Sequence, residues 1–179
     1  MRKTWMLAAL AGSVLVLLQG VSRAQAQTRG LGVRAGWYTG NDFAAGLKKT
    51  HLEGIELGVD IPIAKQTSSI AEVTLSPSIV LGGITRHGAD TDGNIYRVML
   101  NTRRSYSQNM FYGAGIGYSG TQARASQFSN DSGFATSLFV GYEFGTGVGV
   151  GAKPFFQITY HDGTSNKVRG FSFNVGARF

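Results

Sequence analysis

The stretch that decides the fold is FSFNVGARF, residues 171–179. Its apolar or small residues occupy every second position and alternate with polar or small ones: Phe171, Phe173, Val175, Ala177 and Phe179 against Ser172, Asn174, Gly176 and Arg178. A period of two is typical of a β-strand, because successive side chains point to opposite faces. The stretch therefore predicts a strand with one apolar and one polar face that continues to Phe179, where chain termini usually fray into solvent.

The same alternation recurs along the rest of the sequence, whereas no good helical pattern of period 3.6 follows residue 26. The predicted strands cover residues 31–38, 52–63, 70–83, 95–103, 111–118, 134–144, 148–161 and 171–179. Two prolines interrupt this pattern, since proline cannot donate a ladder hydrogen bond. Pro77 predicts a bulge in the third strand, and Pro154 lies either inside the seventh strand or at its start. The fold class is all-β, with eight antiparallel strands.

The first 26 residues have the features of a secretory signal peptide. Arg2 and Lys3 precede an apolar run from Trp5 to Leu18, and an A-x-A site follows at residues 24–26. The run is too short for the roughly 20 residues of a transmembrane helix. We expect cleavage after Ala26, which leaves one domain at residues 27–179 and lowers the formal charge from +7 to +4, with 14 basic and 10 acidic residues. The absence of cysteine excludes a disulfide framework and favours a bacterial protein.

Aromatic residues cluster near both ends of the predicted strands. If the strands run alternately up and down, the apolar faces carry Trp37, Tyr96, Tyr118, Phe134, Tyr160 and Phe171 at their upper ends, and Tyr112, Tyr142, Phe144, Phe156 and Phe179 at their lower ends. Two aromatic girdles with aliphatic residues between them are typical of a membrane barrel. The stretch 134–144 spans about 25 Å along the membrane normal, which matches the expected apolar band. Long upper connections and short lower ones follow the same pattern.

The period-2 strand that ends in an aromatic residue resembles the C-terminal signature of small bacterial outer-membrane barrels of the OmpA/OmpX type. The resemblance covers strand number, architecture and terminal residue, and includes no long motif. It implies an eight-stranded up-and-down transmembrane barrel in the outer membrane. It also implies that the barrel-insertion machinery reads the last strand as an assembly signal, carried by Phe171, Phe173, Val175 and Phe179. We expect a monomer in contact with outer-membrane lipid and lipopolysaccharide.

Charged and polar residues share the face opposite the apolar stripe, so a membrane barrel would hold them in its lumen. They are Arg34, Glu56, Asp60, Glu72, Arg97, Arg103, Glu143, Gln157, His161, Asn174 and Arg178. An eight-stranded lumen is only wide enough to be filled by side chains. Unpaired buried charge is costly, which predicts a hydrogen-bonded, ion-paired network. Inward glycines at 113, 115 and 117 would leave room for arginine side chains from across the lumen.

Two other functions fit parts of the sequence. His161, Asp162 and Ser165 lie close together near the upper end of the seventh strand, as a lipid A acyl hydrolase would require, but such residues are also common in turns. A secreted lipocalin-like barrel would turn the apolar stripe inward around a ligand. His51 and His87 lack metal-ligand spacing, and the scattered basic residues do not indicate nucleic-acid binding. We expect no cofactor and no metal.

The predicted function is a non-enzymatic surface barrel with a structural or surface-interaction role. The predicted extracellular loops are residues 39–51, 85–94, 119–133 and 162–168. Such loops suit recognition, because a rigid scaffold positions them. Basic residues in these loops could contact lipopolysaccharide phosphates; they are Lys48, Lys49, Arg86, Arg124 and Lys167. A solvated connection of the same composition is the alternative interpretation.

Overall fold

The computed structural model describes residues 30–40, 50–65, 71–86, 89–123, 131–145, 151–164 and 169–179. In these ranges the chain forms eight strands: β1 (Gly32–Gly40), β2 (Thr50–Lys65), β3 (Ala71–Arg86), β4 (Ala89–Ser105), β5 (Met110–Ala123), β6 (Asp131–Glu143), β7 (Lys153–Gly163) and β8 (Gly170–Arg178). The predicted signal peptide lies outside the described residues. In the described part, no helix has the length and apolarity needed to cross a membrane.

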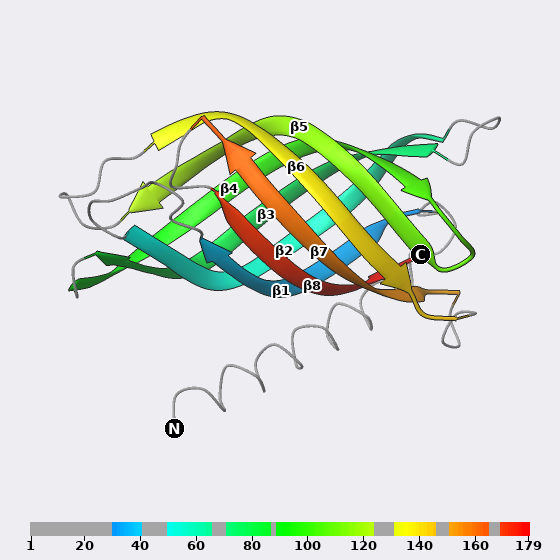
Figure 1. Ribbon diagram of the computed structural model, residues 1–179, viewed down its shortest axis with the longest axis horizontal. Helices are drawn as coiled ribbons and strands as arrows, with labels where there is room; N and C mark the ends of the chain where they lie inside the picture. Colours follow the sequence, from blue (N-terminus) through cyan, green and yellow to red (C-terminus); the bar gives the residue numbers. More distant parts are fainter. Residues whose placement is uncertain are drawn as a thin grey trace, which may run out of the picture.

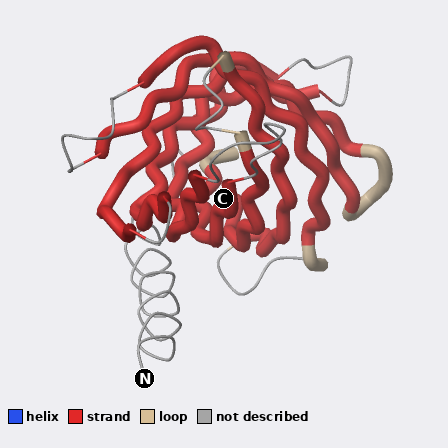
Figure 2. Tube along the Cα trace, turned by 60° about the vertical axis from the view of Figure 1, so that its left-hand side comes forward, coloured by secondary structure: helices blue, strands red, loops and turns tan. Residues whose placement is uncertain are grey.

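The strands form one closed barrel in which each strand pairs with its neighbours in sequence (Figures 1 and 2). All pairs are antiparallel, and β1 closes the barrel on β8 from Gly32↔Arg178 to Gly40↔Gly170. The closure extends to the last residue, because Phe179 N donates a hydrogen bond to Leu31 O at 2.9 Å and Phe179 O accepts one from Gly30 N. The predicted eight-stranded antiparallel barrel is confirmed.

Side chains alternate between the outside of the barrel and its lumen. In β6, Leu138 and Val140 are exposed on the outer face, whereas Ser137 and Phe139 are buried inside. The lumen is narrow enough for inward side chains from opposite walls to meet, as expected for eight strands. The hydrophobic positions that the sequence places on one face therefore form the outer surface of the barrel.

We call the end that holds Gly30 and Phe179 the lower end. The lower connection between β4 and β5 is a tight turn, in which Tyr106 N donates to Met110 O at 2.9 Å and Met110 N donates to Ser107 Oγ at 3.1 Å.

The upper connection between β3 and β4 differs from the prediction. The sequence predicts a loop at residues 85–94, but β3 continues to Arg86 and β4 begins at Ala89, and Thr85 pairs with Asp90. The predicted loop 119–133 is likewise shortened, because β5 runs to Ala123 and β6 starts at Asp131. Ladder hydrogen bonds use backbone groups only, so pairing continues beyond the part of the strands that alternates apolar and polar residues.

The two prolines flagged in the sequence, Pro77 and Pro154, both lie within strands. Pro77 pairs with Val98 of β4 in an unbroken register, but pairing with β2 skips Pro77 and resumes in the same register at Ile61↔Leu75. The missing N–H accounts for this interruption. The bulge predicted at Pro77 is wrong, because the register shift lies in β2, between Pro62 and Ala64. Pro154 is the second residue of β7, which agrees with the later of the two predicted starts.

Candidate functional site

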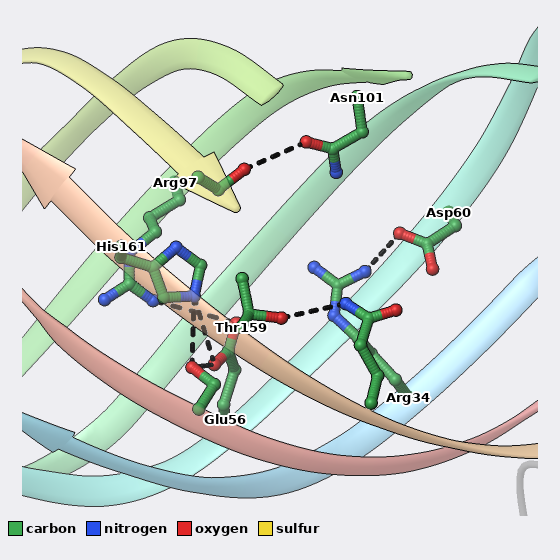
Figure 3. A network of polar contacts seen from close by, with 10 residues as sticks. Arg34, Glu56, Asp60, Arg97, Asn101, Thr159 and His161 are labelled. Atoms are coloured by element: carbon green, nitrogen blue, oxygen red, sulfur yellow. Dashed lines mark hydrogen bonds and ion pairs between the residues drawn. The ribbon is translucent and has the colours of Figure 1, made fainter. Parts of the chain in front are cut away.

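A buried polar cluster occupies the middle of the lumen around Glu56 of β2 (Figure 3). The side chains of Glu56 and Arg97 have relative exposures of 0% and 1%, and Arg97 Nη1 lies 3.7 Å from Glu56 Oε1. Ser172 donates a hydrogen bond to Glu56 Oε2, and Ser172 Oγ lies 3.1 Å from His161 Nε2. The guanidinium of Arg97 also lies 4.6 Å from the centroid of the Tyr38 ring. The cluster thus joins β1, β2, β4, β7 and β8.

A second charged network fills the lower half of the lumen. Arg34 binds Asp60, Arg178 binds Glu72, and Arg103 binds Glu143. Arg178 Nη1 also lies 3.5 Å from Glu143 Oε1, which links two of these pairs. The Arg34–Asp60 pair joins the neighbouring strands β1 and β2. The other two pairs join strands that are not neighbours in the barrel, β8 with β3 and β4 with β6, and so connect separate parts of its wall.

Neutral polar groups lie among these ion pairs. Ser137 Oγ donates to Asn101 Oδ1 at 3.2 Å, and Gln157 Nε2 donates to Thr159 Oγ1 at 2.9 Å (Figure 3). Asn174 is fully buried. The structure thus brings together in the lumen the polar residues that share the inward parity in the sequence.

An aromatic cluster also lies in the lumen, and the polar character of the inward face does not predict it. Phe111, Phe139 and Phe155 are buried in mutual contact, with the Phe111 ring centroid 6.4 Å from that of Phe139 and 6.1 Å from that of Phe155. The Arg103 guanidinium lies 3.6 Å from the Phe111 centroid, which joins the cluster to the charged network. All three phenylalanines lie at inward-facing positions of their strands, as Gly113 does in β5. This parity is the signal in the sequence that could have placed them in the lumen.

The inward glycines accommodate different side chains from those expected. Space over Gly113 is filled by Phe139, and space over Gly115 is filled by Asn101. At Gly58 of β2, by contrast, the space over the glycine is occupied by the guanidinium of Arg34. The prediction that the glycines of β5 make room for arginine is therefore wrong.

Two members of the alternative catalytic set, His161 and Asp162, face opposite sides of the barrel wall. His161 points into the lumen, whereas Asp162 is the next residue of the strand and faces the other way. Asp162 Oδ1 accepts a hydrogen bond from Arg169 Nε at 2.8 Å, and this bond raises the pKa of Arg169 above its ordinary value. Ser165 lies outside the described residues. His161 and Asp162 therefore cannot form a hydrolase dyad, and among the described residues no group of acidic and histidine side chains is arranged to bind a metal.

The lipocalin-like interpretation is also wrong, because it needs the apolar stripe inside. The aliphatic residues of the stripe are exposed on the outer face, whereas Glu56, Arg97 and Asn174 are buried in the lumen. The predicted girdle residues lie on the outer side of the strands by parity. Two girdle pairs are in ring contact, Tyr160 with Phe171 at 5.0 Å and Tyr142 with Phe144 at 5.3 Å between centroids.

Four of the five basic residues of the predicted loops lie outside the described residues; they are Lys48, Lys49, Arg124 and Lys167. Arg86 is the last residue of β3.

Comparison with known proteins gives similarity of fold. No protein-family model matches the chain, and no curated protein sequence matches it. Among solved structures, Neisserial surface protein A (NspA) is similar with a TM-score of 0.59 and 11% identity, over 83% of this chain and 93% of that one. Ail, the attachment invasion locus protein of Yersinia pestis, in complex with the heparin analogue sucrose octasulfate, is similar with a TM-score of 0.50 and 15% identity, over 84% and 98%. The chain therefore has the closed eight-stranded fold of small outer-membrane barrels of the OmpA/OmpX type.

Proposed function

We propose that this protein is a non-enzymatic integral protein of the bacterial outer membrane, with a lumen closed to ions and a surface-interaction role at its upper end. The observation that carries the proposal is the inverted distribution of polarity across the barrel wall. Large apolar side chains cover the outer face, and charged side chains fill the interior. A barrel in water requires the opposite arrangement.

The outer face is the basis for membrane insertion. Its exposed aliphatic residues form a band around the barrel that includes Ile79, Leu81, Val98, Leu100, Ile116, Leu138, Val140 and Val175. Apolar patches of this extent are rare on soluble monomers. Closure of β1 on β8 satisfies the backbone groups that lipid could not. These features together support a transmembrane barrel.

The filled lumen supports a closed barrel. Arg97 and Glu56 meet in the middle of the lumen, and the Phe111 cluster lies with the lower ion pairs. An ion would have to displace these groups to pass. We therefore expect negligible conductance from the purified protein in planar bilayers, and stable single-channel currents would contradict a closed lumen.

The upper strands support a surface-interaction role. At the upper end, β2, β3 and β4 extend further than β1 and β5 do. The uppermost pair of β2 with β3 is Thr50↔Arg86, and the uppermost pair of β3 with β4 is Arg86↔Ala89. In the described part of the chain, the last pairs of β1 and β5 at this end are Thr39↔Glu53 and Gly93↔Ala123. Among the described residues, no strand pairs with the upper edges of β2 and β4, which suits addition of a strand from a partner chain. Lysines 48 and 49 adjoin β2 in sequence.

Cysteine accessibility tests the membrane topology directly. Cysteine at Leu57 or Val140, both on the outer face, should react only with lipid-soluble probes. Cysteine at Asn41 or Ser129, in the predicted extracellular connections, should be labelled from outside intact cells by a membrane-impermeant probe. Labelling of the two pairs the other way round would overturn the proposal.

Mass spectrometry of lipid A tests the non-enzymatic assignment. Lipid A from cells with and without the protein should be identical. A change in its acyl chains that disappears in a His161→Ala variant would show that the protein is a lipid A-modifying enzyme.

A further inference from the structure

Alternation alone leaves open the register in which β1 closes on β8. In β8 the odd-numbered residues face outward by parity, and the even-numbered residues face the lumen. A shift of β8 by two residues against β1 would keep the apolar residues outside and the polar residues inside, because the period of a strand is two. The single register from Gly32↔Arg178 to Gly40↔Gly170 therefore needs a further determinant.

The inward residues of the two strands differ in size at each of four consecutive inward pairs. Along β1 these residues are in turn glycine, arginine, glycine and tyrosine, and each lies opposite a residue of contrasting volume in β8. The pairs are Gly32↔Arg178, Arg34↔Gly176, Gly36↔Asn174 and Tyr38↔Ser172. The side chain of Asn174 occupies the space over Gly36, and the end of the Tyr38 ring occupies the space over Gly170. At this register the inner faces of the two strands fill each other's gaps.

Either shift by two residues would destroy this match. One shift places Arg34 opposite Arg178, so that two large cations would compete for the same space. The other places Arg34 opposite Asn174, again with two large side chains in one pair. Each shift also sets two glycines opposite each other and leaves a gap between them. Overpacking and unfilled space both destabilise a close-packed interior, and like charges in directly opposite positions are unfavourable.

The pairing of β5 with β6 shows the same relation independently. Phe111 lies opposite Gly141, and Phe139 lies opposite Gly113. Each ring occupies the space over the glycine that faces it. A shift by two residues would place Phe111 opposite Phe139 in one direction, and glycine opposite glycine in the other. Contrast in size between inward partners is thus a repeated feature of this barrel.

We propose that the contrast in size between inward partners sets the register in which β1 closes on β8, and with it the stagger of the barrel. Strand number, stagger and diameter are linked in a closed barrel, so this register also fixes which inward side chains meet. The Glu56 cluster depends on it directly. Tyr38 of β1 lies against Arg97, and Ser172 of β8 donates a hydrogen bond to Glu56.

Disulfide trapping in the mature protein, refolded in detergent micelles, reads the register. The chain has no cysteine of its own. Ala35 lies opposite Val175 on the outer face, so Ala35→Cys/Val175→Cys reports the observed register. Ala35→Cys/Phe173→Cys reports the shift that places Arg34 opposite position 174, and Ala35→Cys/Ala177→Cys reports the other shift. Diagonal neighbours are about 7–8 Å apart, which is too far for a disulfide, so each pair reports one register.

Asn174→Gly is the test variant, because it removes the side chain that blocks Arg34 in the first shift. In this background the disulfide yield of the 35/173 pair should rise from background to a level comparable with that of the 35/175 pair. Ser172→Gly is the matched control. It also adds a glycine to the inner face of β8 but leaves Asn174 in place, so only the 35/175 pair should be trapped.

Trapping of the 35/175 pair alone in Asn174→Gly would overturn the proposal. A 35/173 yield that rises equally in both glycine variants would also overturn it, because loss of any inward side chain would then be sufficient. Shifted pairs trapped in the parent background would do the same. If Asn174→Gly does not fold, Asn174→Ala shortens the same side chain without another glycine in the strand, and the same outcomes apply.

Discussion

Glycine on the inner face of the barrel makes space for a particular side chain from a neighbouring strand. A Cβ atom at position 115 would overlap the side chain of Asn101, and one at position 141 would overlap the Phe111 ring. The interior is close-packed, so overlap of this kind forces neighbours off their preferred rotamers. Inward glycine is thus a packing residue in this protein.

Gly115→Ala tests this packing, because the atoms nearest to the added methyl group all belong to side chains, those of Asn101 and Ser137. We expect destabilisation of about 1–3 kcal/mol from overpacking. In an Asn101→Ala background the same substitution should cost much less, as measured by urea unfolding in detergent micelles. An equal cost in both backgrounds would show that Asn101 is not the group that excludes the methyl group.

Arg97→Met tests the energetics of the central ion pair. It leaves the Glu56 carboxylate buried without its counter-charge, and we expect a loss of about 3–5 kcal/mol. Adding Glu56→Gln should recover a large part of this loss, measured by the same unfolding assay. Asp162→Asn, which breaks the more exposed pair with Arg169, should change stability little. If Glu56→Gln gave no recovery, the loss would come from packing of the Arg97 side chain.

Parity in the sequence indicates which charged residues face inward but not which residues they bind. Arg34 and Asp60 lie on the neighbouring strands β1 and β2, but Arg178 of β8 pairs with Glu72 of β3 because the closed barrel brings distant strands face to face. Such pairings depend on the closed geometry, which period-2 alternation does not encode. The sequence also did not predict the cluster of inward phenylalanines. Each strand contributes a single phenylalanine to a face that is otherwise polar or small, so the face as a whole was interpreted as polar.

At the scale of elements, β8 has two partners and closes the barrel. Its inner face contributes Ser172 and Asn174 to the lumen, and its outer face contributes Phe173 and Val175. The last residue, Phe179, adds backbone hydrogen bonds to Leu31 and Gly30 beside β1. Both faces of β8 therefore contribute side chains, one to the lumen and one to the outer surface, and both of its edges are paired with neighbouring strands.

Phe179→Ser should impair assembly far more than secretion. The substitution removes a lower-girdle aromatic residue and, by the resemblance to outer-membrane barrels, damages the insertion signal. Phe144→Ser is the matched control, because it removes a lower-end aromatic residue of similar position from the chain segment after β6. Quantitative blots of outer-membrane and periplasmic fractions should show a larger assembly defect for Phe179→Ser. Equal outer-membrane levels of the two variants would remove the special role of the last residue.

Strand existence could be predicted from alternation, but strand ends could not. The β3–β4 connection contains His, Gly, Ala, Asp and Thr, which is a typical loop composition, yet Ile84↔Thr91 and Thr85↔Asp90 are ladder pairs. Alternation in the sequence shows where one face of a strand is apolar. Backbone pairing continues above this apolar band without an apolar face, so alternation does not show where a strand ends. The register shift at Pro62–Ala64 was similarly hidden, because it depends on how β2 meets β3.

At the scale of the whole molecule, the barrel is apolar outside and charged inside. Leu138 shows this most clearly, since it is 62% exposed while its neighbours Ser137 and Phe139 are buried. In lipid, the exposed apolar band faces an apolar solvent, and the charged side chains inside the barrel are paired with one another. The same distribution would favour aggregation in water.

Leu138→Arg should destabilise the barrel in a bilayer by about 2–4 kcal/mol, the range for a charge near the midplane of a membrane barrel. Gln122→Arg is the control, because Gln122 is exposed near the upper end of β5, where a charge should cost little. Stability is measured by equilibrium unfolding from lipid vesicles. Similar costs for both variants would contradict the depth assigned to Leu138.

The inverted barrel is tested most directly by spin labels placed one at a time along β6 in a lipid bilayer. Labels at Leu138 and Val140 should be accessible to oxygen, which partitions into lipid, and inaccessible to a water-soluble nickel chelate. Labels at Ser137 and Phe139 should be shielded from both reagents, because their side chains lie in the filled lumen. Access of the nickel chelate to 138 and 140, with oxygen access at 137 and 139, would contradict the central claim that the apolar face is turned toward lipid.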